Sequence, residues 1–484
     1  MGEYLYPGVY VEEKKFGTPP MTGGSTSTGA FVGFAPRGPV GEPTFVTSWT
    51  DFVNKFALGA DSPFMKNSYL AYAVYGFFNN GGQRMWVIRA TDGTDSIATS
   101  TVPNGTNVIT FSAKDAGAWA NGIKVDITVN ADFAGTYDVA VSKGTTVLEV
   151  HRQLGMADTA NYHFVGTINA NSKYIKVDTE ATTIVDATLT TKTFTLMGGA
   201  DGLTGISAAH LVSSIRKFDV VDQINLLVVP ESQAQAVTTE AVAYCEKRKD
   251  CVFIADGEMN ADFESIQTHK QLFNSEYMAL YYPWVEISDP IGTVNKTKYV
   301  PTAGHVAGTI ARIDTNRGVF KAPAGIEANL RGVLGVKVKL GDTEQGILNP
   351  KGINVIRAFP DAGIVVWGAR TTANTYLNVR RELNFIMGSI FMSTKWAVFE
   401  PNNADLWRKI RNQVLAFLET RRVLGAYRGS GEGDAYFVKC DGELNTVAEI
   451  NAGRVNAEIG VAINKPGEFI IFRIGQWDGG GSVS

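Results

Sequence analysis

The chain has 484 residues, a formal net charge of −4 and 51 glycines. This length predicts two to four domains, and the small negative charge argues against a general nucleic-acid binder, which would be clearly basic. The sequence has no apolar signal core after a basic start, and no apolar run of the roughly 18 to 20 residues that a membrane span needs. Three cysteines cannot all pair, which favours folding in a reduced cytosolic setting.

The chain opens with a short strand pattern. Val9 and Val11 alternate with Tyr10 within the segment Leu5–Glu13, and Pro7-Gly8 stops the strand from extending backwards. The stretch that follows is rich in Gly, Thr, Ser and Pro and offers no partner strand. Because a lone strand on a tether is unstable, we expect this segment to pair with a sheet edge, either in its own chain or in another copy.

Residues 28–94 are predicted to form the first part of an α/β domain. Strand patterns at 28–35 and 85–89 enclose two helical segments. Ser48 is the expected N-cap of the first helix, and the second, Lys66–Asn80, repeats apolar residues at the three-four spacing of a buried helix face.

The composition changes at about residue 95. From there to residue 203 the chain is rich in Thr, Ala, Val, Asn and Gly, and apolar residues alternate in short runs such as Ile123–Val129. Helical periodicity is hard to find. This pattern predicts an inserted β-rich domain.

Strands alternate with helices from residue 204 to residue 349. Apolar strands are expected at Ile224–Val229, Val252–Ala255 and Met278–Val285, with a helix before each of them. This alternation predicts a parallel α/β sheet, which the segment before the β-rich domain joins. A Gly-, Pro- and Thr-rich stretch then follows and holds Gly304–Ala311.

The last part of the chain is predicted to form a separate α+β domain. It holds helical patterns at Tyr376–Phe391 and Ala404–Leu424, several strand patterns that include Val447–Asn451, and a final strand at Glu468–Ile474. The predicted segments are an N-terminal arm (1–27), the two parts of the α/β domain (28–94 and 204–349), the inserted β-rich domain (95–203), the C-terminal α+β domain (350–467) and a C-terminal arm (468–484).

Signatures of catalysis and ligand binding are missing from the sequence. It has no GxxxxGK[ST] phosphate loop, no GxGxxG after a strand, no HExxH and no GxSxG. Five histidines lack metal-ligand spacing, and Cys245 and Cys251 are interpreted as core residues. A Ser-His-Asp triad could still come from distant positions, so an α/β enzyme with an appended β domain stays as an alternative. We predict no enzyme activity, no cofactor and no metal.

The helical segment Ala404–Leu424 carries a basic stripe. Arg408, Lys409 and Arg411 are expected on its solvent side. One interpretation is a solvated charged face, and the other is a surface that meets an acidic partner. Nucleic acid is less favoured, because no aromatic residues interleave with the charges and the whole chain is acidic.

Several segments together resemble the sheath protein of contractile phage tails and related injection machines. No single motif is specific, but their number and order are, and they cover nearly the whole chain outside about 95–200. In chain order they are Tyr6–Glu13, Thr26–Gly33, Arg37–Pro39, Gly304–Gly308, Lys321–Gly325, Val366–Thr371, Val379–Arg381, Phe399–Asn402 and Lys465–Ile470.

That resemblance implies a structural polymer. Such subunits stack as hexameric rings around an inner tube, and the energy stored in the extended lattice drives contraction without a nucleotide. The implied partners are other copies of the chain, the inner tail tube protein, and baseplate and tail-terminator proteins, with no direct nucleic acid and no membrane insertion. The implied location is the bacterial cytoplasm during assembly, and then the tail of a virion or of a tail-like particle.

The resemblance also implies roles for particular residues. Both terminal arms would add strands to the C-terminal domains of neighbours. The implied arm residues are Tyr6, Val9, Tyr10, Val11, Phe469, Ile470, Ile471 and Phe472. The helix at 404–424 corresponds to the part that holds the inner tube, so Arg408, Lys409 and Arg411 become the expected tube contacts. A non-contractile tube or adhesive assembly protein is the structural alternative, although a rigid tube would not need long tethers at both ends.

Overall fold

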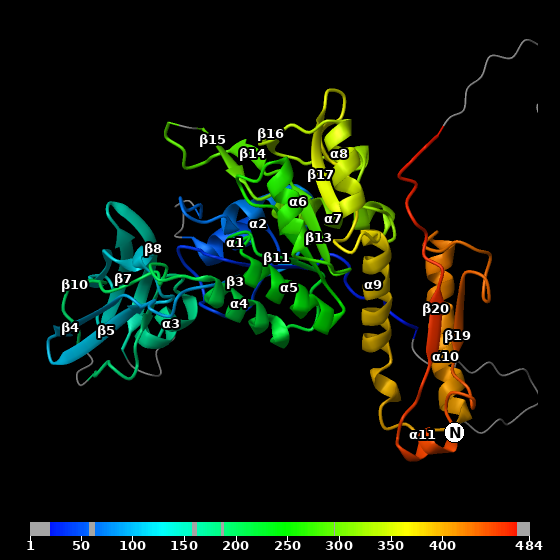
Figure 1. Cartoon of the computed structure of the whole chain (residues 1–484). Coiled ribbons are helices and arrows are strands. Elements are labelled where there is room, and N and C mark those ends of the chain that lie inside the picture. Colours follow the sequence, from blue (N-terminus) through cyan, green and yellow to red (C-terminus); the bar gives the residue numbers. More distant parts are fainter. Residues whose placement is uncertain (1–19, 58–62, 157–161, 185–187, 295, 472–484) are drawn as a thin grey trace, which may run out of the picture. The chain divides into compact units, whose positions relative to one another are not determined.

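A computed structural model describes residues 20–57, 63–156, 162–184, 188–294 and 296–471 (Figure 1). The chain divides into two compact units. The core unit comprises residues 25–384 and the segment from residue 466 onward, and the C-terminal unit comprises residues up to 24 together with 385–465. The chain therefore passes between the two units three times.

The core unit is built on an eight-stranded sheet with the order β18-β17-β13-β12-β11-β1-β3-β2 (Figure 1). Neighbouring strands from β17 to β3 run parallel, and β18 and β2 are antiparallel at the edges. This confirms the predicted parallel α/β sheet. The strands are β1 (Gly29–Gly33), β2 (Thr44–Val46), β3 (Met85–Arg89), β11 (Leu226–Val228), β12 (Val252–Asp256), β13 (Met278–Tyr282), β17 (Ile353–Phe359) and β18 (Gly363–Val366).

Helices cover both faces of this sheet. On one face, alternate strand residues such as Phe31 and Val228 share an apolar cluster with α2 (Leu70–Asn79) and α7 (Ala303–Arg317). On the other face, residues such as Leu227 pack against three further helices. These are α4 (Ala208–Arg216), α5 (Gln235–Arg248) and α6 (Phe263–Gln271). The short helix α1 (Trp49–Phe56) begins at the predicted N-cap, since Ser48 accepts a hydrogen bond from the backbone of Asp51.

The pair α2 and α7 is packed through glycines. A Cβ placed on Gly304 would lie 2.5 Å from the backbone of Ala73, and one on Gly308 would lie 2.3 Å from the Phe77 carbonyl oxygen. Glycine at these two positions lets the helix backbones approach closely. The stretch that the sequence analysis describes only as rich in Gly, Pro and Thr thus contains a long buried helix.

The segment between Thr99 and Thr195 forms two antiparallel sheets around a third apolar cluster. One sheet has the order β4-β5-β9 and the other β10-β6-β7-β8. The strands are β4 (Thr99–Asn104), β5 (Asn107–Ala113), β6 (Ile123–Val129), β7 (Thr136–Lys143), β8 (Thr146–Gly155), β9 (Ile175–Val177) and β10 (Lys192–Thr195). A helix that the sequence did not predict, α3 (Phe164–Asn171), packs with them.

The predicted strand Met278–Val285 is two strands. The first part is β13 of the central sheet, and the chain leaves that sheet after Tyr282 because Pro283 has no N–H to continue the ladder. The second part, β14 (Val285–Ser288), joins a separate sheet with β15 (Thr297–Val300) and β16 (Val333–Val336). A short helix, α8 (Asp342–Leu348), then precedes β17.

The C-terminal unit combines two long helices with a small sheet. Helix α9 (Leu377–Ser393) begins in the core unit and ends in the C-terminal unit, and α10 (Ala404–Val423) follows it. The sheet consists of β19 (Tyr436–Lys439) paired antiparallel with β20 (Glu458–Val461).

Two expectations about this region are wrong. Residues 353–366 extend the central sheet, so the expected boundary at residue 350 lies inside the core, and the compact C-terminal unit starts at Phe385. The expected strand Val447–Asn451 is a helix, α11, on which Val447 is 74% exposed, so its apolar residue does not mark a buried strand face. The segment from Glu468 to Ile471 has no strand partner among the described residues of the single chain, so its expected pairing with another copy stays a prediction.

Candidate functional site

The carboxyl edge of the central sheet is closed by the chain itself. Doubly wound sheets bind ligands where the strand order reverses, which here is between β1 and β11. The Glu231 carboxylate fills this point and accepts hydrogen bonds from Phe34 N–H (3.2 Å), Leu70 N–H (2.9 Å) and the Ser68 hydroxyl (2.6 Å). A Cβ on Gly33 would lie 2.8 Å from the same carboxylate. Glu231 therefore caps helix α2 at this point of the sheet.

A second carboxylate caps the neighbouring helix. Asp256, at the end of β12, accepts hydrogen bonds from Thr302 N–H (2.7 Å) and Ala303 N–H (2.9 Å) at the start of α7. Burial raises the pKa of Asp256 to about 7, and burial lowers the pKa of His305 in the same helix to about 4. Both carboxylates serve as helix caps, which is a structural use of groups that an α/β enzyme would turn toward a substrate.

The described chain offers neither a metal-binding cluster nor a helix that could span a membrane. No group of three or more His, Cys, Asp and Glu side chains in it is placed to hold a metal ion. None of its helices has both the length and the apolar composition to cross a membrane. Cys245 and Cys251 are buried free thiols whose sulfur atoms lie 3.4 Å apart.

The start of the C-terminal arm is anchored on the core unit. The Arg370 guanidinium binds the Glu468 carboxylate in a bidentate ion pair, with Nε 3.1 Å from Oε1. Asn374 accepts a second guanidinium hydrogen bond (2.6 Å), and the Tyr376 ring lies under the cation at 5.4 Å. The Asn354 side chain holds the backbone of Arg370, accepting from its N–H at 2.7 Å. These contacts fix the Arg370 side chain in place on the core unit.

An unpartnered apolar segment follows this anchor directly. Phe469, Ile470 and Ile471 are 76%, 77% and 79% exposed. They continue from a groove of about 520 Å³ in the core unit, whose lining includes Trp367 and Arg357. Of the arm residues expected from the sequence, Tyr6, Val9, Tyr10, Val11 and Phe472 lie outside the described residues.

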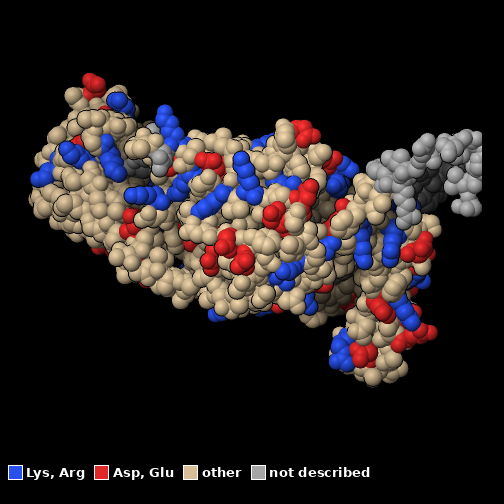
Figure 2. All heavy atoms as spheres, turned by 45° about the horizontal axis from the view of Figure 1, so that its top comes forward, with Lys and Arg blue, Asp and Glu red and all other residues tan. Residues whose placement is uncertain are grey.

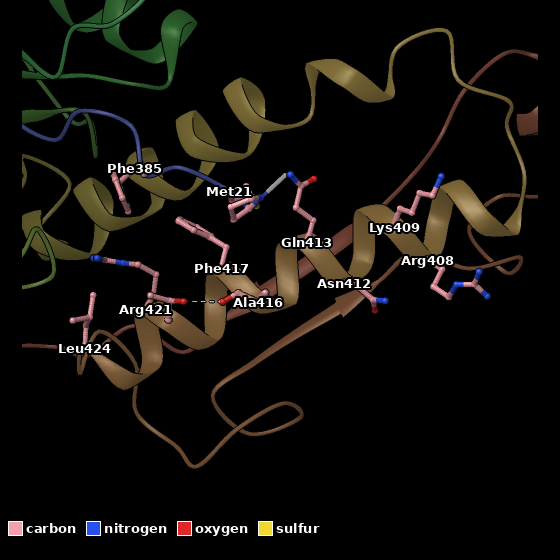
Figure 3. A pocket seen from close by; sticks show the side chains of 13 residues that line it. Met21, Phe385, Arg408, Lys409, Asn412, Gln413, Ala416, Phe417, Arg421 and Leu424 are labelled. Atoms are coloured by element: carbon pink, nitrogen blue, oxygen red, sulfur yellow. Dashed lines mark hydrogen bonds between the residues drawn. The ribbon is translucent and has the colours of Figure 1, made fainter. Parts of the chain in front are cut away.

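The N-terminal segment is held in the other unit. Gly24 N–H donates to the Ser389 hydroxyl of α9 (3.1 Å), and Gly23 lies against the Phe385 ring. Close by, Met21, Phe385 and the α10 residue Phe417 line a groove of about 670 Å³ (Figure 3).

The three basic residues expected to form one stripe on α10 are separated. Arg411 donates to the Val438 carbonyl oxygen of β19 (3.1 Å) and pairs with Glu432 (2.5 Å), so its contacts lie within its own unit although the ion pair is partly exposed. Arg408 pairs with Asp405 at 2.7 Å on the exposed surface.

Lys409 lines the groove beside Asn412, and it leaves the helix in a different direction from Arg408 (Figure 3). It makes no ion pair or hydrogen bond within the described part of the chain. Residues two positions apart on an α-helix point in directions that differ by about 200°. Helical spacing could therefore have placed Lys409 and Arg411 on different sides of the helix. On the face of the molecule in Figure 2, basic and acidic side chains are interspersed, with no large field of one sign.

The chain matches two family models. Residues 204–372 match the phage tail sheath protein central domain, and residues 370–476 match the phage tail sheath C-terminal domain. The tail sheath protein of Enterobacteria phage T4 is 27% identical over 169 residues, which cover 34% of this chain and 24% of that protein. The tail sheath protein of Burkholderia phage BcepMu is 24% identical over 455 residues, 87% of each chain. The chain spans about a quarter of the length of the first curated relatives that it matches.

A solved sheath structure matches nearly the whole length of the chain. The helical sheath of the anti-feeding prophage in its contracted state superposes with a TM-score of 0.61 and 25% identity, covering 97% of this chain and 99% of that one. These matches define a structural subunit of the tail sheath type. The chain belongs to the contractile tail sheath protein family.

Proposed function

We propose that the chain polymerises as stacked hexameric rings around an inner tube, and that contraction of this sheath drives the tube through a target cell envelope. The proposal rests on two parts of the chain that lack a further pairing partner among the described residues, namely a small sheet and an apolar segment. The β19–β20 sheet has only two strands among the described residues, and a sheet of two strands is marginal in water. The apolar residues Phe469, Ile470 and Ile471 after Glu468 are exposed. Strand addition between copies would complete both.

The two arms start from different units of the same subunit. The N-terminal segment is bonded to Ser389 in the C-terminal unit, whereas Arg370 anchors the C-terminal arm on the core unit. Arms attached in this way would link both units of each copy to its neighbours, so the lattice would stay connected while subunits rotate. The energy would be stored in the extended lattice, which agrees with the absence of a phosphate loop in the sequence.

We propose Lys409 and Arg408 as the contacts to an acidic surface of the inner tube. Both are exposed on α10. Arg411 is removed from this role, because its two partners lie in its own unit. Contacts between exposed charges are weak and screened by salt, which would suit a tube that must be released on contraction. Baseplate and tail-terminator proteins complete the proposed partners, with assembly in the bacterial cytoplasm.

Electron microscopy of the purified chain tests the polymer. We expect long hollow cylinders in negative-stain images at moderate protein concentration. A chain that stays monomeric across concentration and salt would contradict the proposal.

Co-assembly with the inner tube protein tests the contact surface. Lys409→Glu should reduce the amount of tube recovered inside the cylinders several-fold, and added salt should reduce the wild-type amount in the same direction. Asp405→Asn is a matched control on the same helix turn, and we expect it to retain the tube. If Lys409→Glu and wild type recover equal amounts, the tube contact lies elsewhere.

A further inference from the structure

Two free thiols of the core unit lie in direct contact. Cys245 belongs to the last turn of α5, and Cys251 directly precedes β12. Their sulfur atoms are 3.4 Å apart, and both residues are 0% exposed. A disulfide bond has a length of about 2.05 Å, so the two sulfur atoms would have to approach by about 1.4 Å to form one. The third cysteine, Cys440, belongs to the C-terminal unit and serves as an internal reference.

Hydrogen bonds hold the backbone on both sides of this contact. The Cys245 carbonyl oxygen accepts from Lys249 N–H (2.9 Å), and Lys249 has the left-handed conformation (φ 65°) that ends α5. The Cys251 carbonyl oxygen accepts from the Asn384 side chain of α9 (3.1 Å). Because both backbones are held, the motion left to the sulfur atoms is rotation about the Cα–Cβ bonds. We expect this rotation to bring the two sulfur atoms together.

We propose that Cys245 and Cys251 are a redox modification site, which hydrogen peroxide converts into an intramolecular disulfide. One sulfur attacks a peroxide oxygen, and the O–O bond breaks to give a sulfenic acid and hydroxide. The second sulfur then attacks the sulfenic sulfur, so that the S–S bond forms, the S–O bond breaks and the oxygen leaves as water. Both thiol protons end in water. Two thiols and one peroxide thus give one disulfide and two waters, and the sulfur atoms lose the two electrons that the peroxide gains.

The contact between the two sulfur atoms decides which oxidation product forms. A sulfenic acid that meets no thiol is open to further oxidation, and the sulfonic acid at the end of that series is irreversible. In this core the second sulfur already touches the first, so it captures the sulfenic acid as a disulfide. A disulfide can be reduced again. The pair would therefore replace permanent damage inside the core by a reversible bond between α5 and β12.

Burial keeps the pair unreactive until the structure around it opens. Burial raises the pKa of the Cys251 thiol, so little of the thiolate that attacks peroxide is present. The residues between the two cysteines form a turn that Arg248 closes, because its guanidinium donates to the carbonyl oxygens of Phe218 and Val221, both at 3.0 Å. The guanidinium also donates to the Asp250 carboxylate at 2.9 Å. We therefore expect the opening of this turn, which Arg248 opposes, to set the rate of oxidation.

Peptide mapping of the full chain tests the pair. The reduced protein is treated with hydrogen peroxide, unfolded in N-ethylmaleimide and digested with trypsin, which cleaves between the two cysteines at residues 247–249. We expect the Cys245 and Cys251 peptides to be joined by a bond that dithiothreitol removes, and Cys440 to be alkylated as a free thiol. Separate alkylated peptides, or sulfinic and sulfonic acids at both positions, would overturn the proposal. The experiment needs no assembled particle, so its result does not depend on the proposed polymer.

Cys251→Ser is the matched control for capture by the second sulfur. Without that sulfur, a sulfenic acid formed on Cys245 has no thiol beside it, and it should accumulate. Dimedone, which labels sulfenic acids, should therefore mark Cys245 several-fold more strongly in the variant than in the wild type. Equal labelling of the two proteins would mean that Cys251 does not capture the sulfenic acid, which would contradict the proposed pair.

Arg248→Ala tests the control of access. Loss of the guanidinium frees the turn, so the disulfide should form several-fold faster at the same peroxide concentration. Lys247→Ala, which removes a side chain that is 76% exposed, should keep the wild-type rate. Asp250→Asn weakens the hold on Arg248 more mildly and should give an intermediate rate, and it carries the test if Arg248→Ala does not fold. Equal rates in all of these proteins would contradict the role given to Arg248, and thiols that stay unreacted in every one would overturn the site itself.

Discussion

The eight-stranded sheet of the core unit and the two-stranded sheet of the C-terminal unit differ at an outer edge. On the eight-stranded sheet, the chain covers the outer edge of β18, because Leu330 N–H donates to the Ile364 carbonyl oxygen (2.8 Å) and Gly325 N–H donates to that of Val366 (2.9 Å). On the two-stranded sheet, β20 has no such cover within the described residues. An uncovered edge is a liability in a monomer, since it templates pairing with another chain. The uncovered edge of β20 is therefore a place where we expect a strand from another copy to add.

The difference also separates stability from assembly. Two apolar clusters bury the core sheet on both faces, so its free energy of unfolding depends on contacts inside one subunit. The small sheet can gain further hydrogen bonds by strand addition from another copy. Changes to the core should therefore alter unfolding, and changes to the arms should alter polymerisation.

The largest effect is expected from removal of the C-terminal arm. A chain that ends at Glu468 keeps the ion pair to Arg370 but loses the apolar strand, so cylinder formation should be abolished. Its thermal midpoint should stay within about 2 °C of the full chain, because Phe469, Ile470 and Ile471 are exposed and do not belong to the core. Electron microscopy and differential scanning fluorimetry measure the two results. Cylinders of normal length from this truncated chain would show that the C-terminal arm is not needed for polymerisation.

A change in the core should produce the reverse outcome. Gly308→Val places atoms against the Phe77 carbonyl oxygen, and we expect a loss of at least about 3 kcal/mol in the free energy of unfolding by urea. Gly388→Ala is the control in helix α9, where an added Cβ would meet nothing within 4 Å. That variant should be neutral or stabilised by up to about 1 kcal/mol. Equal losses in both variants would show that close packing is not the cause.

The stability of the core unit should depend on pH through the carboxyl group of Asp256. The raised pKa of Asp256 means that the folded state holds a proton between about pH 4 and pH 7 that the unfolded state has lost. Stability should therefore fall with rising pH across this window, by about 1 kcal/mol per pH unit, and level off above it.

Asp256→Asn tests this slope. The amide stays neutral and its oxygen can still accept from Thr302 and Ala303, so the slope between pH 5 and pH 7 should be reduced in urea titrations. The control is Asp262→Asn at the start of α6. Hydrogen bonds from Ser265 lower the pKa of Asp262, so that carboxylate stays ionised across the window. If both variants keep the wild-type slope, another titratable group causes the pH dependence of stability.

The smallest effect is expected at the arm anchor. Arg370→Glu should release the arm, raising amide hydrogen exchange at residues 466–471 about tenfold, which corresponds to roughly 1.4 kcal/mol. The double variant with Glu468→Arg restores opposite charges and should recover part of the protection. Exchange that is equally fast in wild type would mean that the ion pair does not hold the arm in solution.

The regular parts of the core could be predicted from the sequence because local pattern and burial agree there. Ser48 caps its helix as expected, and the strands from β11 to β13 fall within their apolar runs. Helix α7 was hidden, because its glycines have low helix propensity and are explained only by α2 packing against them. The domain boundary failed for a related reason, since strand order in a sheet is not encoded locally.

The candidate site was only partly accessible to sequence reasoning. The arms were recognisable from their isolated position and their apolar pattern, whereas the partner of Glu468, Arg370, lies almost a hundred residues earlier and no local signal joins them. The contacts of Arg411 within its own unit could not be predicted, because a basic residue on a helix has the same pattern whether it meets solvent or a strand edge. Only its contacts with Val438 and Glu432 reveal the difference.

The plugged carboxyl edge has a mechanical consequence. Enzymes of similar architecture keep a water-filled mouth there, and lids or domains close over it during each cycle. In this chain Glu231 and Asp256 tie the starts of α2 and α7 to the strand ends, and the core has nothing to close around. We expect the core to travel as a solid body when copies rearrange, with bending confined to the connectors between its units.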